Sequence, residues 1–148
     1  MNRILTISIA TIFGTATLQA ADLSSALEAI SNVSAEGRGH EQAISAWQSL
    51  AKATPDQITV LLGAIREDNP LANNWIRSAV ETVASRSIKK TGSLPAADLE
   101  AFLMDRERNP RARRLAYELI QQVDEDAEAR LIPKMLDDPS VELRRDAV

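Results

Sequence analysis

The chain has 148 residues, of which 45% are hydrophobic, 26% charged and 3% aromatic, and it contains no cysteine. These proportions are typical of a folding globular chain, and the scarcity of aromatic and alternating β-branched residues argues against a broad β-sheet. The lack of cysteine excludes disulfides and thiolate metal sites, and the net charge of −4 argues against general nucleic-acid binding, whose affinity depends on neutralising phosphates.

Residues 1–20 have the layout of a secretory signal peptide. Arg3 supplies a positive start, the stretch 4–18 is mostly apolar or small and carries no charge, and Ala20 offers a small residue before a cut that leaves Ala21 first. The stretch is interrupted by threonine, serine and glycine and falls short of the roughly 20 apolar residues that a membrane span needs. We therefore predict a cleaved signal peptide, export to the periplasm or out of the cell, and no membrane attachment after cleavage.

Beyond residue 21, apolar residues recur at the spacing of one helix face. The second of these stripes contains Ile44 and Trp47, and we expect Trp47 in the core. Thr54, Pro55 and Gln57 form the capping pattern of a helix start, and the longest break between helices is predicted over 86–95. The stripes predict helices around 23–30, 43–51, 58–65, 76–83, 99–103, 112–123, 131–136 and from 141 onward.

Three Asn-Pro or Asp-Pro pairs punctuate these stripes. The α region is disfavoured for a residue that precedes proline, so each pair predicts a short turn between the two helices of a hairpin. Repeats of this length indicate a helical solenoid, and their unequal spacing argues against tetratricopeptide arrays, which keep about 34 residues. The pairs are Asn69-Pro70, Asn109-Pro110 and Asp138-Pro139.

The segment 131–148 reads LIPKMLDDPSVELRRDAV and resembles one HEAT repeat. Pro133 falls inside its first helix, the Asp-Pro pair forms the turn, and Arg144 or Arg145 follows in the second helix. The region of the second pair resembles a weaker copy, the region of the first pair a weaker one still, and residues 22–53 match by periodicity alone.

The resemblance implies an all-α, right-handed α-α superhelix of about three to four HEAT-like hairpins over residues 21–148, because one hairpin cannot bury its apolar face alone. The family commonly pairs the turn acid with an arginine of an adjacent repeat. This implies a pair between Asp138 and Arg113 or Arg114, worth about 0–1 kcal/mol if exposed. Since a solenoid ends on a polar repeat and the last stripe still runs at Val148, we expect the natural chain to continue further.

No catalytic, cofactor or metal constellation is recognisable in the sequence. His40 is the single histidine, whereas metal sites usually take several histidine or cysteine ligands. The carboxylates are explained by helix ends and solvated faces, and there is no Gly-x-Ser-x-Gly elbow. We therefore predict a non-catalytic chain without cofactor or metal.

Two features are candidates for a partner surface. Arg111, Arg113 and Arg114 belong to the one basic cluster, which is either a docking surface for an acidic partner or a solvated turn with one arginine that braces the next repeat. Trp75 stands one position off its apolar stripe, so it either anchors a partner in a groove or packs at the edge of the core.

The sequence thus favours an exported, non-catalytic scaffold of HEAT-like repeats that binds a protein partner. The alternative is the N-terminal helical module of a longer exported enzyme or ligand-binding protein, whose functional site lies beyond Val148. A third hypothesis, a HEAT-like chromophore lyase, shares only the repeat with this chain.

Overall fold

The computed structural model describes residues 13–33 and 39–146, and within them it contains helices and no strand. The predicted all-α fold is therefore confirmed. The helices are α1 (Phe13–Ser31), α2 (His40–Leu50), the short 3₁₀ helix η1 (Pro55–Gln57), α3 (Ile58–Gly63), α4 (Pro70–Thr91), α5 (Ala96–Met104), α6 (Pro110–Gln121), α7 (Ala127–Met135) and α8 (Val141–Asp146).

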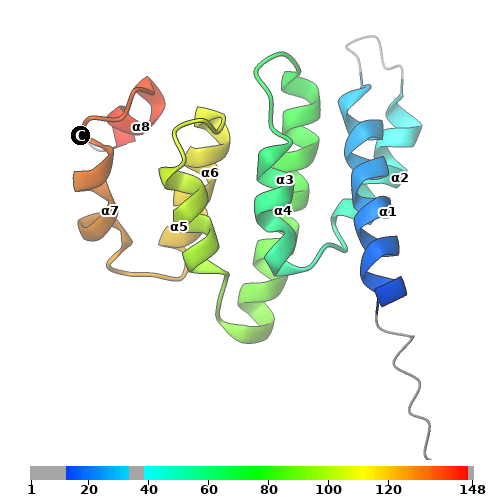
Figure 1. Cartoon of the computed structure of the whole chain (residues 1–148), viewed down its shortest axis with the longest axis horizontal. Coiled ribbons are helices and arrows are strands. Elements are labelled where there is room, and N and C mark those ends of the chain that lie inside the picture. Colours follow the sequence, from blue (N-terminus) through cyan, green and yellow to red (C-terminus); the bar gives the residue numbers. More distant parts are fainter. Residues whose placement is uncertain (1–12, 34–38, 147–148) are drawn as a thin grey trace, which may run out of the picture.

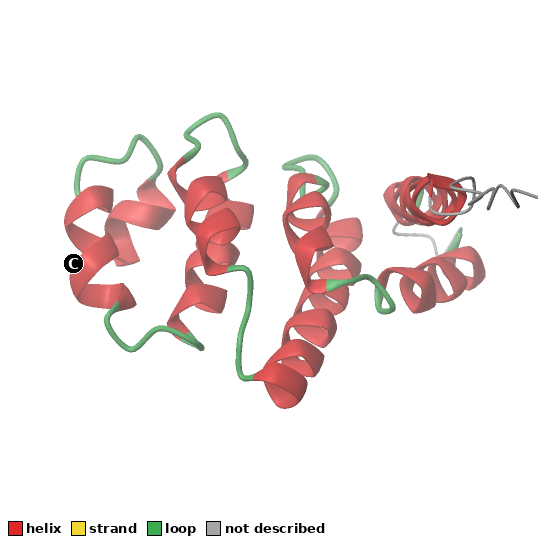
Figure 2. Ribbon diagram, turned by 60° about the horizontal axis from the view of Figure 1, so that its bottom comes forward, coloured by secondary structure: helices red, strands yellow, loops and turns green. Residues whose placement is uncertain are grey.

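The helices form four hairpins that stand side by side in a row, from α1 and α2 at one end to α7 and α8 at the other (Figure 1). Successive hairpins pack on one another through the contacts of α2 with α4, α3 with α6, and α6 with α8. A second view shows the same row of paired helices (Figure 2). The arrangement is that of an α-solenoid, in which each hairpin covers the apolar face of its neighbour.

The core that runs through the row is aliphatic. Leu50, Ile76 and Leu119 are almost fully buried, and alanines such as Ala79 and Ala116 fill the contacts between helices. Small side chains at these contacts allow helix axes to approach to about 8 Å.

The predicted break over 86–95 is wrong, because α4 continues to Thr91. Ser87 is buried in this last turn, and its hydroxyl donates a hydrogen bond to the carbonyl of Ser93 at 2.8 Å. Gly92 ends the helix in the left-handed conformation, with φ of 70°, and its N–H donates to the carbonyl of Ile88. These local bonds extend a helix whose apolar stripe stops earlier.

Helix α1 runs through the predicted cleavage point between Ala20 and Ala21, both of which are exposed. The first twelve residues of the predicted signal peptide and Val148 lie outside the described residues. Burial in α1 is described from Ala20 onward, and Leu23 is the first buried side chain in that range. The buried residues described for α1 therefore all follow the predicted cleavage point. Among the described helices, none is long and apolar enough to cross a membrane.

The Asn-Pro pairs lie between the two helices of a hairpin, and each asparagine also caps the helix that follows. The side chain of Asn69 accepts a hydrogen bond from the third residue of α4, and that of Asn109 accepts two from the start of α6, with proline at the first helical position of each. The third pair differs: Ser140 caps α8 through the N–H of Leu143, at 3.2 Å, so that the Asp-Pro turn precedes the cap.

Polar groups of the second hairpin also satisfy carbonyls at the end of the first. The Nδ2 group of Asn69 donates to the carbonyl of Ser31 at 2.9 Å and to that of Val33 at 3.3 Å, at the end of α1. The guanidinium of Arg86 donates to the carbonyls of Ala51 and Ala53, just after α2. The C-terminal ends of α1 and α2 are thus both hydrogen-bonded to the second hairpin, the first to Asn69 and the second to Arg86.

The third and fourth hairpins are joined by a buried ion pair. Arg113 Nη1 lies 3.0 Å from Asp138 Oδ1 and Nη2 lies 2.5 Å from Oδ2, while Nε donates to the carbonyl of Leu103 at 2.7 Å. The side chains are 2% and 3% exposed. The pair implied by the resemblance is therefore confirmed for Arg113. It is buried, so the contribution of about 0–1 kcal/mol that an exposed ion pair makes to stability does not apply to it.

The ion pair also determines how Asp138 titrates. Burial by itself raises the pKa of this carboxyl, but the hydrogen bonds from Arg113 and from the backbone N–H of Ser140 outweigh burial and lower the pKa below its ordinary value. Because the pKa is lower in the folded chain, the pair stabilises the fold above the unfolded value of about 3.9. That contribution is lost as the pH falls through the folded pKa.

We expect Asn69→Ala to destabilise the fold more than Asn109→Ala. Both substitutions remove an N-cap, worth about 1 kcal/mol, but only Asn69 also donates to carbonyls of a preceding hairpin among the described residues. We expect urea unfolding to show that the free energy of unfolding falls by about 1 kcal/mol more in Asn69→Ala than in Asn109→Ala. Equal losses would show that the bonds between hairpins contribute nothing.

We expect Arg113→Met to lower the free energy of unfolding at neutral pH by about 3–5 kcal/mol, because it leaves a buried carboxylate without its partner. The loss is smaller at acid pH, because burial without a partner raises the pKa of Asp138 in the variant, and the wild type loses its own contribution as the pH falls through the lowered pKa of the paired carboxyl. Urea unfolding at the two pH values measures both effects. The control Arg111→Met, at an exposed position of the same helix, changes stability by about 0.5 kcal/mol or less. A loss that does not depend on pH would contradict the role given to the ion pair.

Candidate interaction surface

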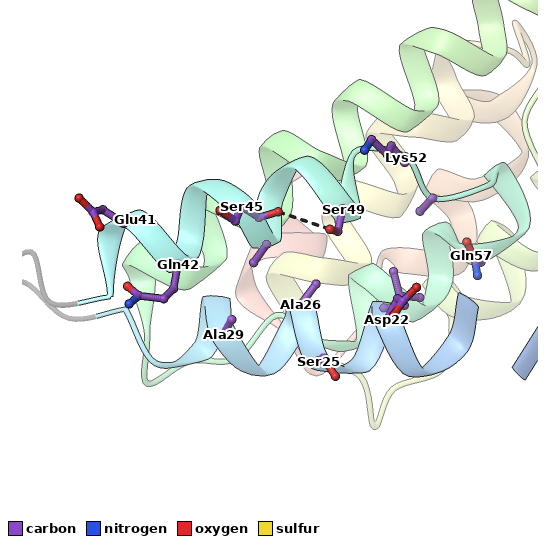
Figure 3. Close-up of a pocket in the computed structure, with 13 residues that line it drawn as sticks. Asp22, Ser25, Ala26, Ala29, Glu41, Gln42, Ser45, Ser49, Lys52 and Gln57 are labelled. Carbon is purple, nitrogen blue, oxygen red and sulfur yellow. Dashed lines mark hydrogen bonds between the residues drawn. The ribbon is translucent and has the colours of Figure 1, made fainter. Parts of the chain in front are cut away.

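An open groove of about 830 Å³ lies between α1 and α2 (Figure 3). Small side chains such as Ser25, Ala29 and Ser45 line its middle, and the hydroxyl of Ser49 donates to the carbonyl of Ser45 at 3.4 Å. Charged side chains lie toward its ends and come from Asp22, Glu41 and Lys52. This composition provides space but no constellation of catalytic or metal-binding groups.

A second surface lies where α2 and α4 run side by side. The rings of His40 and Trp75 meet edge to face, with centroids 5.7 Å apart, and Arg86 reaches the carbonyl of Ala51 at the other end of α2. The two helices therefore run parallel. We call the strip along this contact the α2–α4 seam, formed by His40, Ile44 and Trp47 of α2 and by Leu71 and Trp75 of α4.

The seam exposes more apolar surface than the sequence predicts. Ile44 and Leu71 are each 41% exposed, and the indoles of Trp47 and Trp75 are half-buried against the core. Ile44 belongs to the predicted apolar stripe but is exposed, because α2 turns Ala43, Ala46 and Leu50 inward. Ile44 follows His40 by four residues, so it lies on the same side of α2 as the ring that contacts Trp75.

The exposed face of α4 continues from the seam toward the C-terminal end of the helix. Here Ser78, Thr82 and Ser85 line a shallow hollow of about 700 Å³ with the charged side chains Glu81, Arg86, Lys89 and Lys90. Lys89 and Lys90 are exposed and form no ion pair with any described residue. Glu81 pairs with Arg77 at 2.8 Å and is the one carboxylate among three cations that line the hollow, so this end carries net positive charge.

The structure separates the residues that the sequence grouped as a partner surface. Trp75 lies on the α2–α4 seam, whereas Arg111 and Arg114 lie on α6. Arg113 is 1% exposed and is unavailable to a partner, so its place in the predicted surface was wrong. The interpretation of the basic cluster as a turn with one bracing arginine fits its contacts, since that arginine is Arg113.

Surface charges elsewhere link neighbouring hairpins. Arg77 of α4 donates to Glu118 of α6 at 2.8 Å, and Lys134 of α7 donates to Glu100 of α5 at 3.0 Å. Hydrogen bonds from Arg130 and Lys134 lower the pKa of Glu100. Exposed pairs of this kind contribute about 0–1 kcal/mol each, so they add little to the apolar contacts.

His40 makes a ring contact with Trp75. Within residues 13–33 and 39–146, no group of three or more histidine or carboxylate side chains is placed to hold a metal ion.

Comparisons with known proteins leave the function to be argued from this surface. No protein-family model, no curated protein and no solved structure matches the chain. The α2–α4 seam is the candidate that combines exposed apolar side chains with aromatic rings.

We expect Ile44→Ser and Leu71→Ser to lower the free energy of unfolding by no more than about 1 kcal/mol each, because both side chains are partly in water. Leu50→Ala, in the fully buried face of α2, costs about 2–5 kcal/mol by leaving a cavity. Thermal and urea unfolding give the comparison. A loss for Ile44→Ser as large as that for Leu50→Ala would show that the seam belongs to the core.

Proposed function

We propose that this chain is an exported, non-catalytic scaffold of HEAT-like repeats and that its α2–α4 seam binds a protein partner. The observation that carries the proposal is the exposure of Ile44 and Leu71 beside two half-buried indoles. Tryptophan is enriched among the residues that dominate binding energy at protein interfaces, and aliphatic neighbours help to exclude water from them. Scattered apolar side chains are ordinary on a surface, but a strip gathered along one helix pair is characteristic of an interface.

The rigidity of the seam supports the same proposal. The seam crosses from the first hairpin to the second, and Asn69 and Arg86 bind the ends of α1 and α2 to α4. A surface that is held in place before binding loses less conformational freedom when a partner docks. The bonds at both ends of the seam thus keep its aromatic rings in a fixed relation.

Export and repeat type enter the proposal from the sequence. The layout of residues 1–20 supports export, and the Asn-Pro turns with the pair between Arg113 and Asp138 support HEAT-like repeats. The absence of a recognised catalytic motif in the sequence supports a scaffold over an enzyme.

We expect a photo-crosslinking amino acid at position 44, in the cells that produce the protein, to capture a discrete protein. The same group at position 60, where Val60 is 52% exposed on α3, serves as the matched control and captures none. Gel mobility and mass spectrometry identify the product, and fractionation with N-terminal sequencing tests for export and a mature start at Ala21. Equal labelling from both positions, or none from position 44, would contradict the proposed function.

A further inference from the structure

The apolar seam and the positive end of α4 lie on one face of the same helix. Leu71, Trp75, Ser78, Thr82 and Lys89 follow one another at separations of three, four and seven residues, which keep side chains on one side of a helix. At 1.5 Å per residue, Trp75 and Lys89 are about 21 Å apart along the axis. A ligand that contacts both must therefore carry apolar and charged groups about 21 Å apart.

We infer that the strip from Leu71 to Lys90 binds an amphipathic helix of the partner whose first turn is acidic and whose apolar side chains follow about ten to eighteen residues later. The bound helix lies antiparallel to α4, with its acidic turn at Lys89 and Lys90 and its apolar side chains at Ile44, Leu71 and Trp75. This inference rests on the proposed function and names the chemistry of its partner.

Charge complementarity selects an acidic segment. The chain carries a net charge of −4, yet Lys89 and Lys90 extend from α4 without an acidic partner among the described residues. The helix dipole explains why cations suit the last turn of α4, but the ammonium groups remain in solvent and accessible to carboxylates. Opposite charge at this end steers an acidic segment toward the strip and fixes its register.

The middle of the strip suits a helix better than a bulky or strongly polar ligand. Ser78 and Thr82 have small side chains, and the hydroxyl of Thr82 donates to the carbonyl of Ser78 at 2.8 Å. This bond stays within α4, so the hydroxyl donor needs no acceptor from the ligand. Small side chains allow a second helix axis to approach to about 8–10 Å.

The direction of the bound helix follows from helix dipoles. Acidic side chains stabilise a helix when they stand in its first turn and destabilise it in its last. Since the lysines lie at the C-terminal end of α4, an acidic first turn reaches them only when the ligand runs antiparallel to α4. The α2 helix is parallel to α4, so the ligand dipole opposes both.

The test uses two synthetic peptides of about 18 residues with the same composition and blocked ends, since about 14 residues span the distance from Lys89 to Trp75. One carries three glutamates in its first turn and three leucines near its end, and the other has the reverse order. Fluorescence anisotropy with the full chain should show binding of the acid-first peptide and about tenfold weaker binding of the reverse one.

Variants of the protein separate the two ends of the strip. The double variant Lys89→Glu and Lys90→Glu should bind the acid-first peptide about tenfold or more weakly in low salt. The difference in affinity should become smaller at higher salt, which screens the charges. Lys52→Glu, an exposed cation in the groove between α1 and α2, is the control and should change binding by less than about twofold. Ile44→Ser should weaken binding with no change in its salt dependence, and circular dichroism verifies that each variant is folded.

Several outcomes overturn the inference without touching the proposed function. Equal binding of both peptides, or equal effects of the Lys89/Lys90 and Lys52 variants, rejects the oriented acidic helix. Anionic phospholipid vesicles that displace the peptide would identify a membrane surface as the ligand instead. If position 44 crosslinks to a protein whose labelled segment lacks the acid-first helix, the scaffold stands and the inference fails.

Discussion

The structure depends on one constraint, which is that a two-helix hairpin leaves an apolar face that only another hairpin can cover. The four hairpins satisfy this constraint by standing in a row, with a continuous aliphatic core between them. Apolar contact alone does not fix how neighbouring hairpins align with one another, because the hydrophobic effect is non-directional. Directional bonds between hairpins supply what burial lacks. Asn69 and Arg86 bind carbonyls at the ends of the first hairpin, and Arg113 binds the turn acid Asp138 of the last.

The same constraint explains why the α2–α4 seam is apolar on the outside. Helix α2 is short and uses its small residues, Ala43 and Ala46, to approach the other helices closely. Its larger residue Ile44 is therefore left on the flank, beside the longer α4. Because Arg86 and the contact of His40 with Trp75 hold both ends of α2 against α4, this flank is a fixed surface. A strip of this kind recognises a partner by shape and by the order of charge along it.

The length of α4 gives the strip its second half. If the helix ended near residue 86, as the sequence predicts, the two lysines would lie in a loop with no fixed relation to Trp75. The bond from the Ser87 hydroxyl to the carbonyl of Ser93 and the left-handed Gly92 extend the helix through Thr91. The two lysines therefore lie on the same continuous helix as Leu71, at a fixed distance from it. Local hydrogen bonds at the end of one helix thus decide whether charge and apolar groups form one surface.

The sequence by itself determined the helices, their order and the Asn-Pro turns, because the 3.6-residue period and the restriction before proline act locally. A family resemblance added the pair between Arg113 and Asp138, but whether that pair lies in water or in the core depends on how the third and fourth hairpins close over it. Tertiary structure alone decided that Ile44 is exposed and that Trp75 meets His40. A stripe of apolar residues in the sequence shows which side of a helix is hydrophobic. How much of that side a neighbouring helix covers is decided by the tertiary packing.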